Sequence, residues 1–94
     1  MARYVTLIRF TDQGARNLKK SPARALAFRK AAEKTGVKVE AQLWTLGKED
    51  GLLILSGEER KVLRVLTQLA VLGNVRTRTM PAYEAAEFQT LVAK

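Results

Sequence analysis

The spacing of apolar and polar residues changes several times along the chain, and each change marks an expected structural element. Stretches rich in β-branched, aromatic and aliphatic residues are typical of strands, whereas apolar residues three and four positions apart indicate one face of a helix. The predicted strands are residues 3–10, 37–46, 52–55 and 75–80. The predicted helices are residues 22–35, a helix that opens within 56–59 and runs to about Leu72, and residues 84–93. The predicted order is therefore β-α-β-β-α-β followed by a terminal helix.

Glycine, proline and serine define the boundaries of these elements. The clearest is residues 44–55, WTLGKEDGLLIL, where two β-forming runs flank a turn with a glycine at each end. Ser21 and Pro22 are typical of a helix start, and Gly36 is typical of the residue after a helix end. Pro81 is expected to end the fourth strand. Within the first long helix, Arg24 is expected on the solvated side.

This order of elements predicts a single α+β domain over residues 1–94, a ferredoxin-like βαββαβ sandwich with a C-terminal helix. Its four-stranded antiparallel sheet should have the order 4-1-3-2, with both main helices on one face because such crossovers are right-handed. The central third strand, LLIL, is apolar on both of its sides. We expect Trp44 and Met80 beside it on the face that the helices leave open. A second copy of the chain, as a two-fold dimer, or the terminal helix in the same chain would cover that face.

Composition excludes several kinds of chemistry. The chain has no cysteine and no histidine, which removes disulfides, thiolate catalysis and the commonest metal ligand and general base. The nine acidic residues show no metal-ligand spacing, so we predict no metal and no cofactor. The first residues lack the pattern of a signal peptide, and no apolar run is long enough to span a membrane. We therefore expect a cytoplasmic protein.

The net charge of +8 raises the question of an acidic partner. The 17 basic residues occur in no block longer than two, which also fits a solvated surface. RNA-recognition-motif domains share the predicted topology, but they need aromatic residues on the central strands, where this chain has LLIL. Nucleic acid is therefore an unlikely partner, and only weak non-specific contact with phosphates remains.

Four segments of the chain resemble the GYD family of small, mainly bacterial proteins. They are YVTLIRFTDQG, KKSPAR, WTLGKEDGLLIL and LGNVRTRTMPAY, in the order and spacing of the family. The resemblance covers almost the whole chain and implies a ferredoxin-like fold similar to the dimeric α+β barrels, with no established activity. The family takes its name from a turn that here reads Gly47-Lys48-Glu49-Asp50. Glu49 stands where the family's tyrosine would be, so no role of that tyrosine carries over.

Five residues are candidate ligand contacts, and each also has a simpler structural interpretation. Trp44 could stack on a ligand or anchor an interface. Asp50 could present a carboxylate at a cavity rim or bond the local backbone of its turn. Arg76 and Arg78 could clamp an anion or protect an edge strand from pairing. Tyr83 could donate a proton or pack in a core or interface.

These residues favour a small homo-oligomeric binding or regulatory protein without enzymatic activity. It would hold a small anionic or aromatic ligand between packed sheets, in a cleft lined by Trp44, Arg76, Arg78 and Met80. An alternative is a cofactor-free enzyme of the dimeric-barrel kind that acts on a small hydrophobic substrate. A third is weak, non-specific nucleic-acid binding by the basic surface. The sequence alone leaves the ligand and any reaction open.

Overall fold

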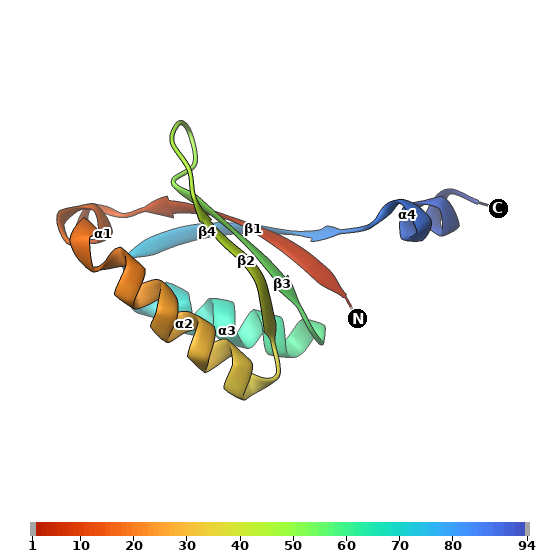
Figure 1. Cartoon of the computed structure of the whole chain (residues 1–94), viewed down its shortest axis with the longest axis horizontal. Coiled ribbons are helices and arrows are strands. Elements are labelled where there is room, and N and C mark those ends of the chain that lie inside the picture. The colour runs from red at the N-terminus through yellow and green to blue at the C-terminus, as the bar shows by residue number, and fades with distance from the viewer. Residues whose placement is uncertain (1, 94) are drawn as a thin grey trace.

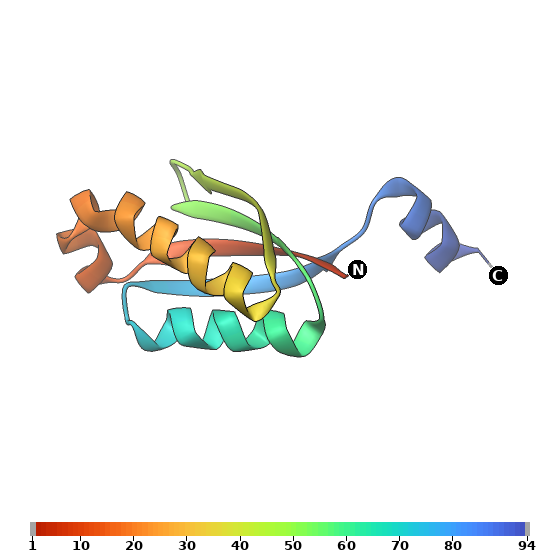
Figure 2. The ribbon, with the colours of Figure 1, turned by 60° about the horizontal axis from the view of Figure 1, so that its bottom comes forward.

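The computed structural model describes residues 2–93. Its elements follow the predicted order, and a short helix and a 3-10 turn follow the first strand. They are β1 (Arg3–Phe10), α1 (Asp12–Arg16), η1 (Leu18–Lys20), α2 (Ser21–Thr35), β2 (Lys38–Trp44), β3 (Gly51–Ser56), α3 (Glu59–Val71), β4 (Val75–Ala82) and α4 (Ala85–Val92). The strands form one antiparallel sheet in the order β2-β3-β1-β4, which confirms the predicted order. Both α2 and α3 lie on one face of this sheet (Figures 1 and 2).

The hydrophobic core lies between that face and the two helices. On β3, Leu53 and Leu55 point to the helices and are buried, and their neighbours alternate to the other face. Val62 and Val65 of α3 meet them from the helix layer and are also buried. Each fully buried aliphatic side chain of this kind stabilises the fold by about 1.5–3 kcal/mol. Of the two helices, α3 therefore contributes more of the buried core side chains.

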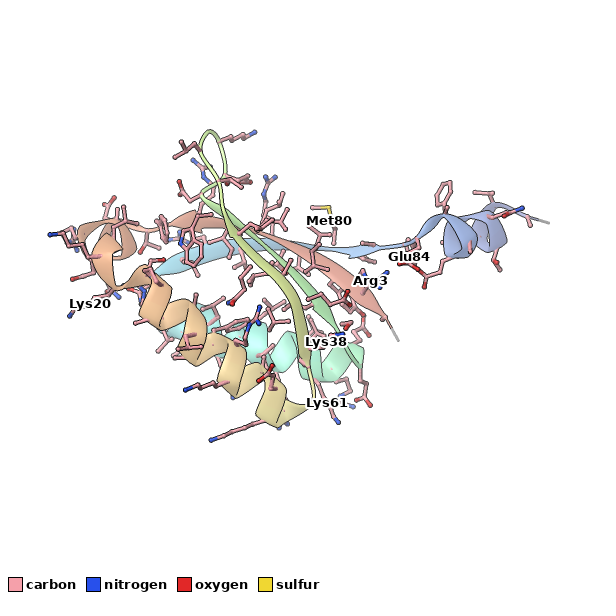
Figure 3. The ribbon with its side chains drawn as sticks, viewed as in Figure 1. Arg3, Lys20, Lys38, Lys61, Met80 and Glu84 are labelled. Carbon is pink, nitrogen blue, oxygen red and sulfur yellow. The ribbon has the colours of Figure 1, made fainter. Side chains whose placement is uncertain are left out.

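A β-bulge in β2 moves the residues after it to the opposite faces from those that strict alternation gives. Val39 lies opposite Leu55, but Ala41 rather than Glu40 lies opposite the next residue of β3. Because one extra residue shifts the faces, Trp44 turns to the helix side, where its indole N–H donates to Ser21 of α2. The expectation that Trp44 lies on the open face is therefore wrong. Met80 does stand on the side of the sheet away from the helices (Figure 3).

The last strand and helix extend away from the rest of the molecule. β4 continues through Pro81 to Ala82, so the expected strand end at Pro81 is wrong. Because β4 is an edge strand, a residue without a backbone N–H is tolerated there. α4 projects beyond the end of the sheet (Figure 1), and it does not fold back over the open face. Arg3 holds its start through ion pairs to Glu84, at 3.3 Å, and to Glu87, at 4.0 Å.

Candidate functional site

A cleft of about 340 Å³ lies between α2, the C-terminal half of α3 and one end of the sheet. It exists because the residues that α2 turns toward the sheet are mostly small, namely Ala25, Ala27 and Ala31. The larger Leu26 points to solvent and is 53% exposed. Figure 1 shows α2 and β2 diverging from the loop that joins them. The spacing of Ala23, Leu26, Ala27 and Ala31 in the sequence predicts one small, mostly alanine face that packs closely, whereas in the structure Leu26 lies outside.

The walls of the cleft are mainly apolar. Phe28 contributes from α2, Leu53 from β3 and Leu69 from α3. The other apolar side chains that line it are Ile8, Phe10, Val65, Leu72 and Val75. Such a concave surface with few polar groups is typical of sites for small apolar ligands.

Most polar groups around the cleft bond to one another. The Trp44 indole N–H donates to the Ser21 hydroxyl at 3.0 Å, which ties β2 to the start of α2. The Gln42 amide donates to the carbonyl of Ala25 at 3.0 Å, and its oxygen accepts from Arg29 at 3.2 Å. These bonds bridge α2 and β2 across the mouth of the cleft. They leave these groups little capacity for a ligand.

Arg24 differs from these polar groups because one of its nitrogens has no hydrogen-bond acceptor within residues 2–93. Its Nη1 donates to the carbonyl of Asn17 at 2.9 Å. Its Nη2 is buried, and no group among residues 2–93 accepts a hydrogen bond from it. The expectation that Arg24 is solvated is therefore wrong. No residue pattern signalled this, because an arginine on an alanine-rich helix ordinarily belongs to the exposed side.

Asp50 lies at the edge of the cleft, where β3 begins. Its carboxylate oxygen Oδ2 accepts from the backbone N–H of Phe10 at 2.8 Å, and its own N–H donates to the carbonyl of Ile8 at 2.8 Å. The preceding residue, Glu49, forms an ion pair with Arg78 of β4. The loop between β2 and β3 therefore bends back across the end of β1. The carboxylates of Glu49 and Asp50 fix the loop in this position.

The opposite surface of the sheet, which we call the open face, carries an apolar strip between charged residues. Strand register places in this strip Val5, Leu7, Ala41, Leu43, Leu52, Ile54 and Met80. Arg9, Arg76 and Arg78 flank it on the same side and are exposed. No helix of the described chain covers the strip (Figure 1).

The structure does not bring the five predicted ligand residues together in one site. Trp44 and Asp50 line the cleft under the helices. Arg76 and Arg78 lie across the sheet on the open face. Tyr83 follows β4 and is 54% exposed, near the start of the projecting α4. Sequence reasoning missed Arg24 and Ser21, which complete the polar end of the cleft.

Between residues 2 and 93, no cluster of three or more acidic side chains is arranged to hold a metal ion. Within the same range, no helix has the length and apolar character needed to cross a membrane.

A four-stranded antiparallel sheet with both main helices on one face makes this chain a ferredoxin-like α+β protein. The chain belongs to the GYD domain family, whose model matches residues 4–92. It is also 34% identical over 89 residues to a protein of Thermus thermophilus described as "Glutamine synthetase and cystathionine beta-lyase binding protein". That match covers 93% of this chain and 94% of the relative. The resemblance seen in the sequence is thus confirmed, and the comparisons indicate a small binding or regulatory protein.

Proposed function

We propose that this chain is a small homodimeric regulatory protein that binds metabolic enzymes and presents α4 to them. The observation that supports this most directly is the exposed apolar face of α4. Phe88, Leu91 and Val92 are 57%, 59% and 61% exposed, and their spacing of i, i+3 and i+4 puts them on one side of the helix. An amphipathic helix with anchors at this spacing is a common way to fill an apolar groove of a partner protein.

The attachment of α4 suits this role. The side chains of Glu84 and Glu87 cap its first turn, and Arg3 of β1 pairs with both. The helix therefore leaves the sheet in a defined direction although it has little packing against the body. A binding element held in place in this way loses less conformational entropy when it docks.

The relative from Thermus thermophilus is described as binding glutamine synthetase and cystathionine beta-lyase. We propose enzymes of these two kinds, from the same cell, as the partners of this chain. The match extends over 93% of the chain, so it includes much or all of the surface that would make contact. Regulation would then come from docking onto the enzyme, and the proposal assigns no chemical step to this chain.

We further propose that the open face packs against the open face of a second copy. The apolar strip runs along all four strands, and a two-fold axis would bring two such strips together. The flanking Arg76 and Arg78 would lie at the rim, where charges remain solvated. A dimer of this kind carries two copies of α4, so it could bind an oligomeric enzyme at two points and gain affinity without new contacts.

Surface plasmon resonance with purified glutamine synthetase and cystathionine beta-lyase of the same organism tests the proposal. The wild-type chain should bind at least one of them, and the double variant Phe88→Ser, Leu91→Ser should lose binding. Leu63→Ser is the matched control, because Leu63 is similarly exposed, at 53%, but lies on α3. Binding that survives in the double variant, or no binding of either enzyme by the wild type, would overturn the proposal.

A further inference from the structure

The cleft under α2 contains one charged hydrogen-bond donor that lacks an acceptor. Arg24 uses Nη1 to bond the carbonyl of Asn17, while Nη2 is buried and unbonded within residues 2–93. A buried charged donor without a partner is costly to the fold, so an acceptor such as a water, an ion or a ligand group would stabilise it. A carboxylate is the acceptor that best matches a guanidinium in both charge and geometry.

The rest of the cleft indicates what this carboxylate is attached to. The volume of about 340 Å³ lies near the lower end of the range for small-molecule sites. The walls beyond Arg24 are formed largely by Phe28, Leu53 and Leu69, which offer no hydrogen bond from their side chains. We propose that the cleft binds a small apolar monocarboxylic acid, a medium-chain aliphatic or arylalkanoic acid. Its carboxylate would bond Arg24, and its apolar end would lie between α2, α3 and the sheet.

The other polar side chains of the cleft support Arg24 as the residue that bonds the ligand carboxylate. Ser21, Trp44 and Gln42 already bond one another or the backbone of α2. Among residues 2–93, the only acidic side chain that lines the cleft is Asp50, which accepts a hydrogen bond from the backbone N–H of Phe10. Asp50 forms no ion pair with Arg24 in the described part of the chain. Arg24 is the only cationic side chain among the lining residues of the described chain, so it alone can pair with the charge of the ligand.

The cleft is lined from α2 and α3, on the other side of the sheet from the open face, and α4 projects away from these two helices (Figure 2). The inference therefore goes beyond the protein-binding role. Acid binding and enzyme binding can each succeed or fail without the other, so the two tests are separate.

The chain provides its own reporter, because Trp44 is the only tryptophan and lines the cleft. The test is a fluorescence titration of the wild-type protein with sodium octanoate below its critical micelle concentration, and with octanol as the uncharged match. A saturable change in Trp44 emission is expected with octanoate. Octanol should bind about 10- to 100-fold more weakly, as expected for the loss of one charge-assisted hydrogen bond.

Two variants and one control assign the site. Arg24→Gln should weaken octanoate binding by about 10- to 100-fold and bring the affinity for octanoate close to that for octanol. Ala25→Leu narrows the cleft without changing any charge, so it should weaken the binding of both compounds. Arg64→Gln removes an exposed arginine of α3 outside the cleft and should bind as the wild type does. Circular dichroism establishes that each variant is folded.

Several results would overturn the inference. These are the absence of a saturable signal, equal affinities for octanol and octanoate, or an Arg24→Gln variant that binds as Arg64→Gln does. A further one concerns α4. If Phe88→Ser, Leu91→Ser increased octanoate affinity, the cleft would be the docking site of α4 from a second copy, and the small acid would be only a competitor.

Discussion

The carboxylate of Asp50 accepts a hydrogen bond from the backbone N–H of Phe10, with 2.8 Å between Oδ2 and N, although 40 positions separate the two residues in sequence. A second bond, from Asp50 N–H to the carbonyl of Ile8, lies beside it. Together they attach the loop between β2 and β3 to the last residues of β1. The aspartate of the family's naming turn thus has a structural task in this chain, whether or not it also faces a ligand.

Asp50→Ala should lower the free energy of unfolding by about 1–3 kcal/mol, because it removes a charged acceptor and leaves the Phe10 N–H unbonded. Asp50→Asn should cost less, since its amide oxygen can still accept. Urea unfolding followed by Trp44 fluorescence measures both. Lys48→Ala, an exposed change in the same loop, should stay within about 0.5 kcal/mol of the wild type. Equal effects of Asp50→Ala and Lys48→Ala would contradict the structural role.

Gly14→Ala should be among the more destabilising single-methyl additions in the chain. A Cβ at Gly14 would lie 2.0 Å from the backbone oxygen of Asn74, the same oxygen that accepts from Thr11 N–H at 3.1 Å. Since backbone atoms must move apart to admit the methyl group, we expect a loss of about 2–3 kcal/mol or more. Thermal and urea unfolding would measure it, with the exposed Arg16→Ala of the same helix as control. A Gly14→Ala protein as stable as the control would contradict this close approach.

The order of elements and the order of strands were predictable because they depend on local period and on the handedness of crossovers. Structural details that depend on a single residue were not predictable from the sequence. The bulge in β2 reverses the side on which Trp44 lies, and an alternating strand gives no sign of one extra residue. The direction of α4 depends on the ion pairs of Arg3 with Glu84 and Glu87, which lie more than 80 positions later in the sequence.

The candidate site was less predictable for the same reason. Trp44 and Asp50 were predicted from their residue types as candidate ligand contacts, and both line the cleft. Arg24 looked like a solvated helix residue, and only the distance between α2 and the sheet buries its guanidinium nitrogen. Gly14 carries no local sign of its role, because its small size is required by the backbone of Asn74, 60 residues later. Contacts between distant segments decide such roles, and a local pattern does not contain them.

The open face makes a prediction about oligomeric state. Size-exclusion chromatography with light scattering should show a mass of twice the 10.5 kDa of one chain. Leu7→Lys with Met80→Lys, which places two extra cations within the apolar strip, should shift the protein to the monomer because burying unpaired charges is costly. Leu63→Lys, on the outer side of α3, should remain dimeric. A wild type that is monomeric at all concentrations, or a double variant that stays dimeric, would contradict packing through this face.

Glu40 makes a prediction about pH. The Ser56 hydroxyl, and then the Arg3 guanidinium 3.5 Å away, hold the pKa of the Glu40 carboxyl below its ordinary value of 4.5, against the opposing effect of burial. A lowered pKa in the folded state means that ionised Glu40 stabilises the fold above pH 4.5, and that this contribution disappears as the pH falls through the folded-state value. In urea unfolding, Glu40→Gln should therefore be less stable than the wild type at pH 7, and the difference should shrink steadily as the solution is acidified below pH 4.5. Glu33→Gln, an exposed change on α2, serves as the control. A difference for Glu40→Gln that stays constant with pH would show that its carboxylate is not held in the ionised form by these partners.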